Sequence, residues 1–227
     1  MLVPYRINEI DLNNIIFKKI KESKNKKIIF IKYNDNKVNN FVFQLPTLNN
    51  NIEITNTNQF EINLDCINKN KEESLLTFLN NLDDKIIHES KNNTNWFDHL
   101  VDKSFIKYQR IIKDNNYHNG CINFKIINND DLKTKLVLND DEIDIYNIPN
   151  NNGLCKIMLE CYAIWINECN FGLLLRPIII SFKIKLVYNY KFINDSDTEE
   201  DTIFIKNEHN NIINLNLNLS NSETSEN

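Results

Sequence analysis

Glycine is scarce in this chain, with three in 227 residues. Neither GxxxxGK[ST] nor GxGxxG can be written with so few, which excludes the glycine-rich loops that cradle nucleotide phosphates. GxSxG, HExxH and the paired H-x-E and P-C-x-x-C motifs are absent as well. We therefore identify no catalytic residue and expect the protein not to be an enzyme.

Paired cysteines are also missing. The five cysteines form no CxxC pair, and structural zinc sites usually bring cysteine ligands in such close pairs. We expect free, mostly buried thiols, no metal site and no cofactor.

Long apolar runs are absent too. No stretch approaches 18 apolar residues without a charge, and the N-terminal MLVPYRINEIDL has no apolar signal region. This predicts a soluble protein that is not secreted and has no membrane segment.

Charge is divided unevenly along the chain. The formal net charge is −5, yet residues 192–227 alone hold eight acids and one lysine. The remaining 1–191 then carry 25 bases and 23 acids. We expect 1–191 to form a single domain and 192–227 to be an acidic, partly disordered tail. Such a tail is either solvated disorder or a polyanion mimic that competes for a basic groove.

The longest apolar passage runs from Cys155 to Tyr190 and organises the rest. Its odd positions from Ile157 to Trp165 are all apolar and the even ones are mixed, which is typical of a half-buried strand. The residues 169–172 (CNFG) supply a turn, and the returning segment alternates again near its end. Two long strands joined this tightly are expected to pair antiparallel.

The other segments show less regular patterns. Hydrophobic spacing predicts a helix over 7–22 and a hairpin between 28–33 and 38–45. Two helices are expected near 71–90 and 95–113, together an insert over 71–113. Further strands are expected at 52–55, 60–66, 121–127, 134–138 and 142–146. The predicted class is α+β, mainly β: an antiparallel barrel like the oligonucleotide-binding fold, with a helical insert between early and late strands. A β-sandwich with an inserted helical hairpin is the alternative.

Several of these stretches together resemble one protein family. They are LDCINKNKEESLLTFLNNLDDKIIHES (64–90), NWFDHLVDKSFIKYQRII (95–112), CINFKII (121–127), AIWINECNFGLLLRPIIISFKI (163–184) and the upstream FVFQLPTL (41–48). This order is similar to the single-stranded-DNA-binding proteins of nucleocytoplasmic large DNA viruses, which are distantly similar to phage replication proteins. The resemblance implies a barrel fold, sequence-tolerant binding of single-stranded DNA during viral DNA replication, recombination or repair, and a place in the host cytoplasm or the virion. It also implies an acidic tail that contacts replication proteins, but here the densest acid run, 195–201, is internal.

Aromatic and basic residues interleave on the organising hairpin. Single-stranded nucleic acid needs both kinds of side chain, because bases stack on aromatic rings and cations neutralise phosphates. The candidate nucleic-acid-binding residues are Tyr162, Trp165, Phe171, Arg176, Lys183 and Lys185. Trp165 belongs to the apolar odd face, so a position in the core is its first interpretation and a position in the binding surface its second. Phe171 has the alternative role of anchoring the turn. Tyr162 is the better stacking candidate.

A second function remains open at this stage. A strand-rich, nearly neutral body also suits a structural or scaffold protein of a virion that contacts other proteins. The oligomeric state is open as well, with a homo-oligomer among the alternatives.

Overall fold

The computed structural model describes residues 4–23, 26–34, 40–50, 52–56, 59–97, 102–115, 118–127, 132–149, 153–184, 203–206 and 212–215. The chain divides into two compact units, residues 1–184 and 185–227. The described residues of the first unit form a ten-stranded sheet, a four-stranded sheet and one long helix, α1 (Lys69–Asn92). The fold is therefore mainly β, and the strand pairings of the described residues do not close either sheet into a barrel.

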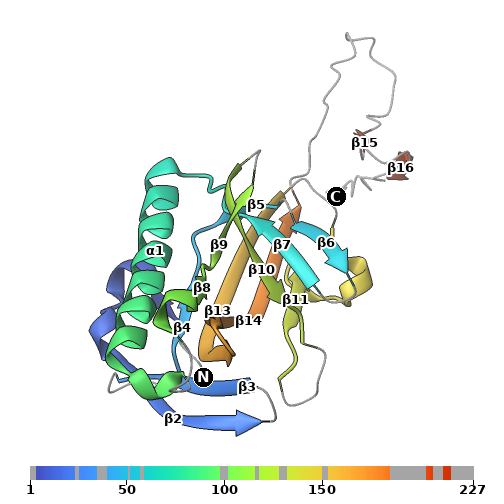
Figure 1. The fold of residues 1–227 in the computed structure, drawn as a ribbon. Coiled ribbons are helices and arrows are strands. Elements are labelled where there is room, and N and C mark those ends of the chain that lie inside the picture. Colours follow the sequence, from blue (N-terminus) through green and yellow to red (C-terminus); the bar gives the residue numbers. More distant parts are fainter. Residues whose placement is uncertain are drawn as a thin grey trace, which may run out of the picture. The chain divides into compact units, whose positions relative to one another are not determined.

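The ten-stranded sheet is built on two strands, β13 (Gly153–Asn167) and β14 (Asn170–Ile184), of 15 residues each. They pair antiparallel along their whole length, as the sequence predicts, and run side by side through the middle of the unit (Figure 1). The other eight strands are β1 (Tyr5–Arg6), β2 (Ile15–Ser23), β3 (Lys26–Tyr33), β4 (Val42–Gln44), β5 (Leu48–Asn49), β8 (Lys107–Gln109), β11 (Lys135–Leu138) and β12 (Asp141–Glu142). Most of the pairings are antiparallel, but β1 with β4, β11 with β14 and β8 with β14 are parallel.

The N-terminal helix predicted over 7–22 is wrong. Short 3-10 turns at Ile7–Glu9 and Leu12–Asn14 lead into β2, which pairs antiparallel with β3. β-branched residues such as Ile15 and Ile16 favour a strand once a partner strand is present. The hairpin predicted between 28–33 and 38–45 is also wrong, because β3 and β4 each pair with β13, at different levels along it.

The four-stranded sheet contains β6 (Ile52–Asn56), β7 (Gln59–Asn63), β9 (Ile112–Asn115) and β10 (His118–Lys125), in the order β6-β7-β10-β9. Strands predicted at 52–55, 60–66 and 121–127 are thus confirmed with shifted ends. The second predicted helix, 95–113, is wrong: that segment holds 3-10 turns at Thr94–Trp96 and Lys103–Phe105, then β8 and β9. The strand predicted over 142–146 is wrong in part, since after β12 the chain forms a 3-10 turn at Ile145–Asn147.

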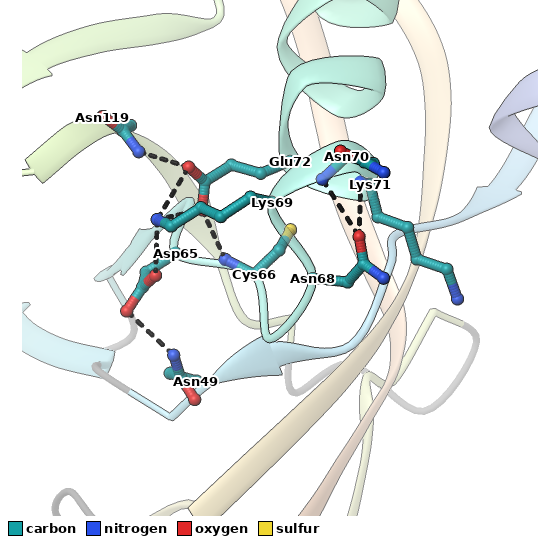
Figure 2. Close-up of polar contacts among 9 residues, drawn as sticks. All are labelled: Asn49, Asp65, Cys66, Asn68, Lys69, Asn70, Lys71, Glu72 and Asn119. Carbon is teal, nitrogen blue, oxygen red and sulfur yellow. Dashed lines mark hydrogen bonds and ion pairs between the residues drawn. The ribbon is translucent and has the colours of Figure 1, made fainter.

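Helix α1 confirms the prediction for 71–90, and its N-terminus is firmly capped (Figure 2). The Asn68 side chain accepts hydrogen bonds from the backbone N–H groups of residues 70 and 71, at 3.0 and 3.3 Å. The buried Glu72 carboxylate accepts from the Cys66 N–H and from the Lys69 ammonium at 2.9 and 3.1 Å, and also from the Asn119 amide. An acid in the first turn also interacts favourably with the helix dipole. Burial raises the pKa of the Cys66 thiol to about 11, and the nearby carboxylates add a smaller contribution. This thiol therefore stays protonated.

The hydrophobic core lies between α1, the four-stranded sheet and one face of the ten-stranded sheet. Leu75, Leu79 and Leu82 of α1 are fully buried, and Phe78 packs edge-on against Phe43 of β4 at 5.2 Å between ring centroids. We call the face of the ten-stranded sheet that packs into this core the inner face, and the opposite face the outer face.

A buried carboxylate joins α1 to the segment that replaces the second predicted helix. Asp83 is completely buried, and it accepts hydrogen bonds from the Tyr108 hydroxyl at 2.6 Å and the Ile111 N–H at 3.1 Å. Burial raises the pKa of Asp83, although these hydrogen bonds and the Arg110 guanidinium oppose the rise. β8 is thereby held against the edge of β14 near its turn.

The second unit, residues 185–227, contains one described hairpin. Its strands are β15 (Ile203–Lys206) and β16 (Ile212–Leu215), which pair antiparallel. The predicted acid run at 195–201 lies outside the described residues.

Candidate nucleic-acid interface

The turn of the long hairpin lies earlier than the sequence predicts. Asn167 pairs with Asn170, so Glu168 and Cys169 form a two-residue turn, and Glu168 adopts a left-handed backbone with φ 52°. The predicted turn residues Phe171 and Gly172 therefore belong to β14. This shift decides which face each of them occupies.

A β-bulge at Tyr162 exchanges the faces of β13. Cys161 pairs with Leu175 and Ala163 with Leu174, so β13 has one extra residue at this point. Before the bulge, odd residues such as Ile157 and Leu159 enter the core. After it, Ile164 and Ile166 do so. One inserted residue moves every later side chain to the opposite face, so the odd-position pattern that begins at Ile157 does not describe the strand beyond the bulge.

The bulge places Trp165 on the outer face. Trp165 is half-buried and is not part of the core cluster, so its assignment to the core is wrong. Directly opposite on β14 is Gly172, where an added Cβ would lie 3.0 Å from the indole Nε1. The absence of a side chain at Gly172 gives the indole room to lie across the strand.

Phe171 takes the opposite position. It pairs with Ile166 on the inner face and is 2% exposed. Its ring packs edge-on against Phe97 at 5.3 Å and Tyr108 at 5.0 Å. Phe171 therefore anchors the core below the turn and does not join the surface that carries Trp165.

Strand β3 adds an aromatic ring to this surface. Phe30 lies opposite Ala163 and so points to the same outer face as Trp165, one diagonal position away. Residues in diagonal positions of an antiparallel pair of strands lie about 7–8 Å apart. Phe30 is half-buried and outside the core cluster.

Lysines of β2 border the same rings. The Lys21 ammonium lies 5.1 Å from the centroid of the Phe30 ring, and Lys21 pairs with Ile28, the residue opposite Trp165. The pairing of β2 and β3 shifts between Phe17 and Ile20, which leaves Lys18 and Lys19 exposed opposite Phe30. These lysines extend the basic border along the edge strand.

Arg176 and Tyr162 occupy the outer face on the other side of the bulge. Arg176 pairs with Glu160, and its Nε donates a hydrogen bond to the Glu160 carboxylate. The guanidinium lies over the Tyr162 ring, 5.6 Å from its centroid. Burial raises the pKa of the Tyr162 hydroxyl, so it is neutral in neutral solution.

The last two predicted site residues lie apart from this surface. Lys183 is exposed but pairs with Leu154 near the far end of the hairpin, roughly 20 Å from Arg176 at about 3.3 Å per residue. Lys185 lies outside the described residues. The structure thus brings together three of the six predicted residues, Tyr162, Trp165 and Arg176.

Four residues of this surface are not among those predicted from the sequence: Phe30, Lys18, Lys19 and Lys21. The three lysines lie in the segment assigned to a helix, so they were not placed beside a strand. The alternation in KKIIFIKY (26–33) could have indicated Phe30, because it places Phe30 on the side of the strand opposite to Ile29, Ile31 and Tyr33. These three residues are buried in the structure.

The described residues contain no cluster of three or more His, Cys, Asp or Glu side chains suited to a metal ion. Within the same residues, no helix has the length and apolar character needed to cross a membrane. Comparison of the chain with known protein families and with curated proteins found no match.

Proposed function

We propose that the protein binds single-stranded nucleic acid across the outer face of β2, β3, β13 and β14. The observation that carries this proposal is the gathering of three half-buried aromatic side chains, Phe30, Tyr162 and Trp165, on one sheet face beside lysines. Aromatic rings on an outward sheet face lose no apolar contact by accepting a flat base, whereas rings in a core cannot reach one.

Physical chemistry favours a single-stranded ligand over a duplex. Unpaired bases expose their faces and stack on aromatic side chains with about 1–3 kcal/mol each, whatever the base. Lys18, Lys19 and Lys21 form a row of cations along β2 that suits the phosphates of an extended strand. Because stacking does not distinguish bases strongly, binding should tolerate many sequences.

The sequence resemblance supports DNA as the natural ligand and viral replication, recombination or repair as the setting. The proposal includes an oligonucleotide-binding type of barrel, in which the outer face described here forms part of the binding wall. It also includes the acidic residues 192–227 as a segment that competes for the basic surface and contacts replication proteins.

The proposal is tested by fluorescence anisotropy with a labelled oligo-dT and with a duplex of equal length. We expect oligo-dT to bind more tightly, with an affinity that falls as salt rises at a slope of about −0.7 per neutralised phosphate. Equal affinity for duplex, or binding insensitive to salt, would contradict the proposal. Absence of any binding would favour the alternative, a structural or scaffold protein.

A pair of charge variants locates the surface. Lys18→Glu with Lys19→Glu should weaken oligo-dT binding roughly tenfold at low salt, because two phosphate contacts are replaced by repulsion. Lys71→Glu with Lys125→Glu changes the net charge equally at exposed positions of α1 and β10. This control should leave binding nearly unchanged; an equal loss would mean that only the total charge matters.

A further inference from the structure

Glu160 is an acid in an unexpected place. Its register puts it on the outer face, where its partners in the neighbouring strands are Arg176 and Val42. It is nevertheless 5% exposed. A carboxylate buried so far requires a close counter-charge, and a negative charge on a surface that binds phosphates opposes that binding.

The contacts of Arg176 explain what Glu160 does there. The Glu160 carboxylate accepts a hydrogen bond from the Nε of the guanidinium, and the central carbon of the guanidinium lies over the Tyr162 ring. Among the described residues, no acceptor bonds to either terminal nitrogen, Nη1 or Nη2. Glu160 and Tyr162 thus hold the Arg176 side chain while its terminal N–H groups remain available. The Arg176 side chain is 20% exposed.

We propose that Arg176 is a preorganised phosphate-binding residue for single-stranded nucleic acid, and that Glu160 is its positioning residue. This proposal rests on the proposed function and assigns one subsite within it. The phosphate bound by the Arg176 terminal nitrogens belongs to a nucleotide whose base lies beside Tyr162. A guanidinium is suited to this role because its N–H groups form a rigid planar fork that matches phosphate oxygens.

The positioning role predicts an effect opposite in sign to simple charge counting. Glu160→Met keeps a similar volume in the buried position but removes both the negative charge and the hydrogen-bond acceptor. Charge counting predicts tighter binding of a polyanion. Positioning predicts binding weaker by roughly three- to tenfold, the range that corresponds to loss of one hydrogen bond held in place.

The conservative variant separates orientation from charge. Glu160→Gln removes the same charge but keeps an acceptor oxygen for the Arg176 Nε, so it should recover part of the affinity that Glu160→Met loses. Arg176→Lys keeps the positive charge but lacks the fork, and should weaken binding by a similar factor. Arg110→Lys, on the connection between β8 and β9, is the matched control and should have no effect.

The experiment is an anisotropy titration of labelled oligo-dT with the full chain and these four variants, over a salt series. Circular dichroism melting confirms that each variant is folded. We expect the affinities to rank wild type and Arg110→Lys above Glu160→Gln, and Glu160→Gln above Glu160→Met and Arg176→Lys. If wild type binds but Glu160→Met binds as tightly or more tightly and Arg176→Lys equals wild type, the subsite is overturned and the proposed function stands. If wild type itself does not bind oligo-dT, both are overturned.

Discussion

The two faces of the β13–β14 hairpin differ in what they do with the same kinds of residue. On the inner face, Phe171 and Ile164 are packed against other apolar groups. On the outer face, Trp165 and Tyr162 are half-buried and have lysine or arginine neighbours. The difference shows that aromatic residues of one hairpin can pack into the core or lie half-buried at the surface, depending on the side to which the backbone directs them.

The largest expected effect is a loss of stability on replacing Ile164, which is next to Trp165 on β13 but faces the core. Ile164 is fully buried, so Ile164→Ala should lower the free energy of unfolding by about 2–5 kcal/mol through lost transfer energy and a cavity. Urea denaturation measures the loss. The folded fraction should bind oligo-dT with unchanged affinity; a specific loss of affinity at equal folded concentration would mean that the inner face also takes part in binding.

The next effect concerns the buried carboxylate on the core side. Tyr108→Phe removes a hydrogen bond of 2.6 Å to Asp83, which should cost about 1.5–3 kcal/mol of stability when the carboxylate is ionised. Burial raises the pKa of Asp83 above its ordinary 3.8. The folded protein therefore holds the proton of the Asp83 carboxyl group more tightly than the unfolded chain does. The stability that this proton contributes is therefore fully present below about pH 4 and is lost as pH rises through the folded pKa.

The pH dependence of the Tyr108→Phe variant checks this sign. Loss of the hydroxyl raises the pKa of Asp83 further, so the penalty should grow from pH 4 to pH 7 in urea denaturation. A penalty that is the same at every pH would show that the hydroxyl does not interact with the ionised carboxylate.

The third effect separates recognition from stability on the outer face. Trp165→Ala should weaken oligo-dT binding by about 1–3 kcal/mol, the contribution of one stacked base. Its effect on unfolding should be smaller than that of Ile164→Ala, because the indole is only half-buried. If Trp165→Ala instead destabilises the protein as much as Ile164→Ala and binds normally, the two faces have been assigned in reverse.

The smallest effect concerns the acidic tail. Replacing Asp195, Asp197, Glu199, Glu200 and Asp201 by their amides should raise affinity for oligo-dT a few-fold at about 20–50 mM salt, since tethered acids compete with phosphates at high effective concentration. The gain should shrink at physiological salt because screening is stronger there. An affinity equal to wild type at low salt would show that these acids do not compete.

Part of this fold follows from sequence patterns. The long hairpin and α1 were predicted because their apolar residues repeat over many positions, with periods of two and near 3.6. The helix predicted over 7–22 is wrong because the isoleucines there fit a helix and a strand about equally well, and pairing with β3 decides between them. In 95–113, Trp96 and Phe97 are buried under the sheet and Asp83 binds residues 108 and 111, tertiary contacts that override local helical spacing.

The candidate site was only partly predictable for a related reason. Interleaved aromatic and basic residues indicated Tyr162, Trp165 and Arg176, which do share one face. The bulge at Tyr162 and the turn at Glu168 fix which face each residue occupies, and the apolar residues at odd positions alone do not locate either of them. Phe30 and the lysines of β2 come from distant positions, so only the sheet pairing places them beside Trp165.

The most direct test of the central claim uses the two tryptophans of the chain, because each lies on a different side. Trp96 is 3% exposed and packs against Phe17 of the inner face, whereas Trp165 lies on the outer face. In a Trp96→Phe variant, addition of oligo-dT should quench the fluorescence of Trp165 in a saturable and salt-sensitive manner, because a base stacks on the indole. In a Trp165→Phe variant, the fluorescence of the remaining Trp96 should not change when oligo-dT is added. Binding of oligo-dT without quenching of Trp165, or with quenching of Trp96 alone, would contradict recognition by the outer face.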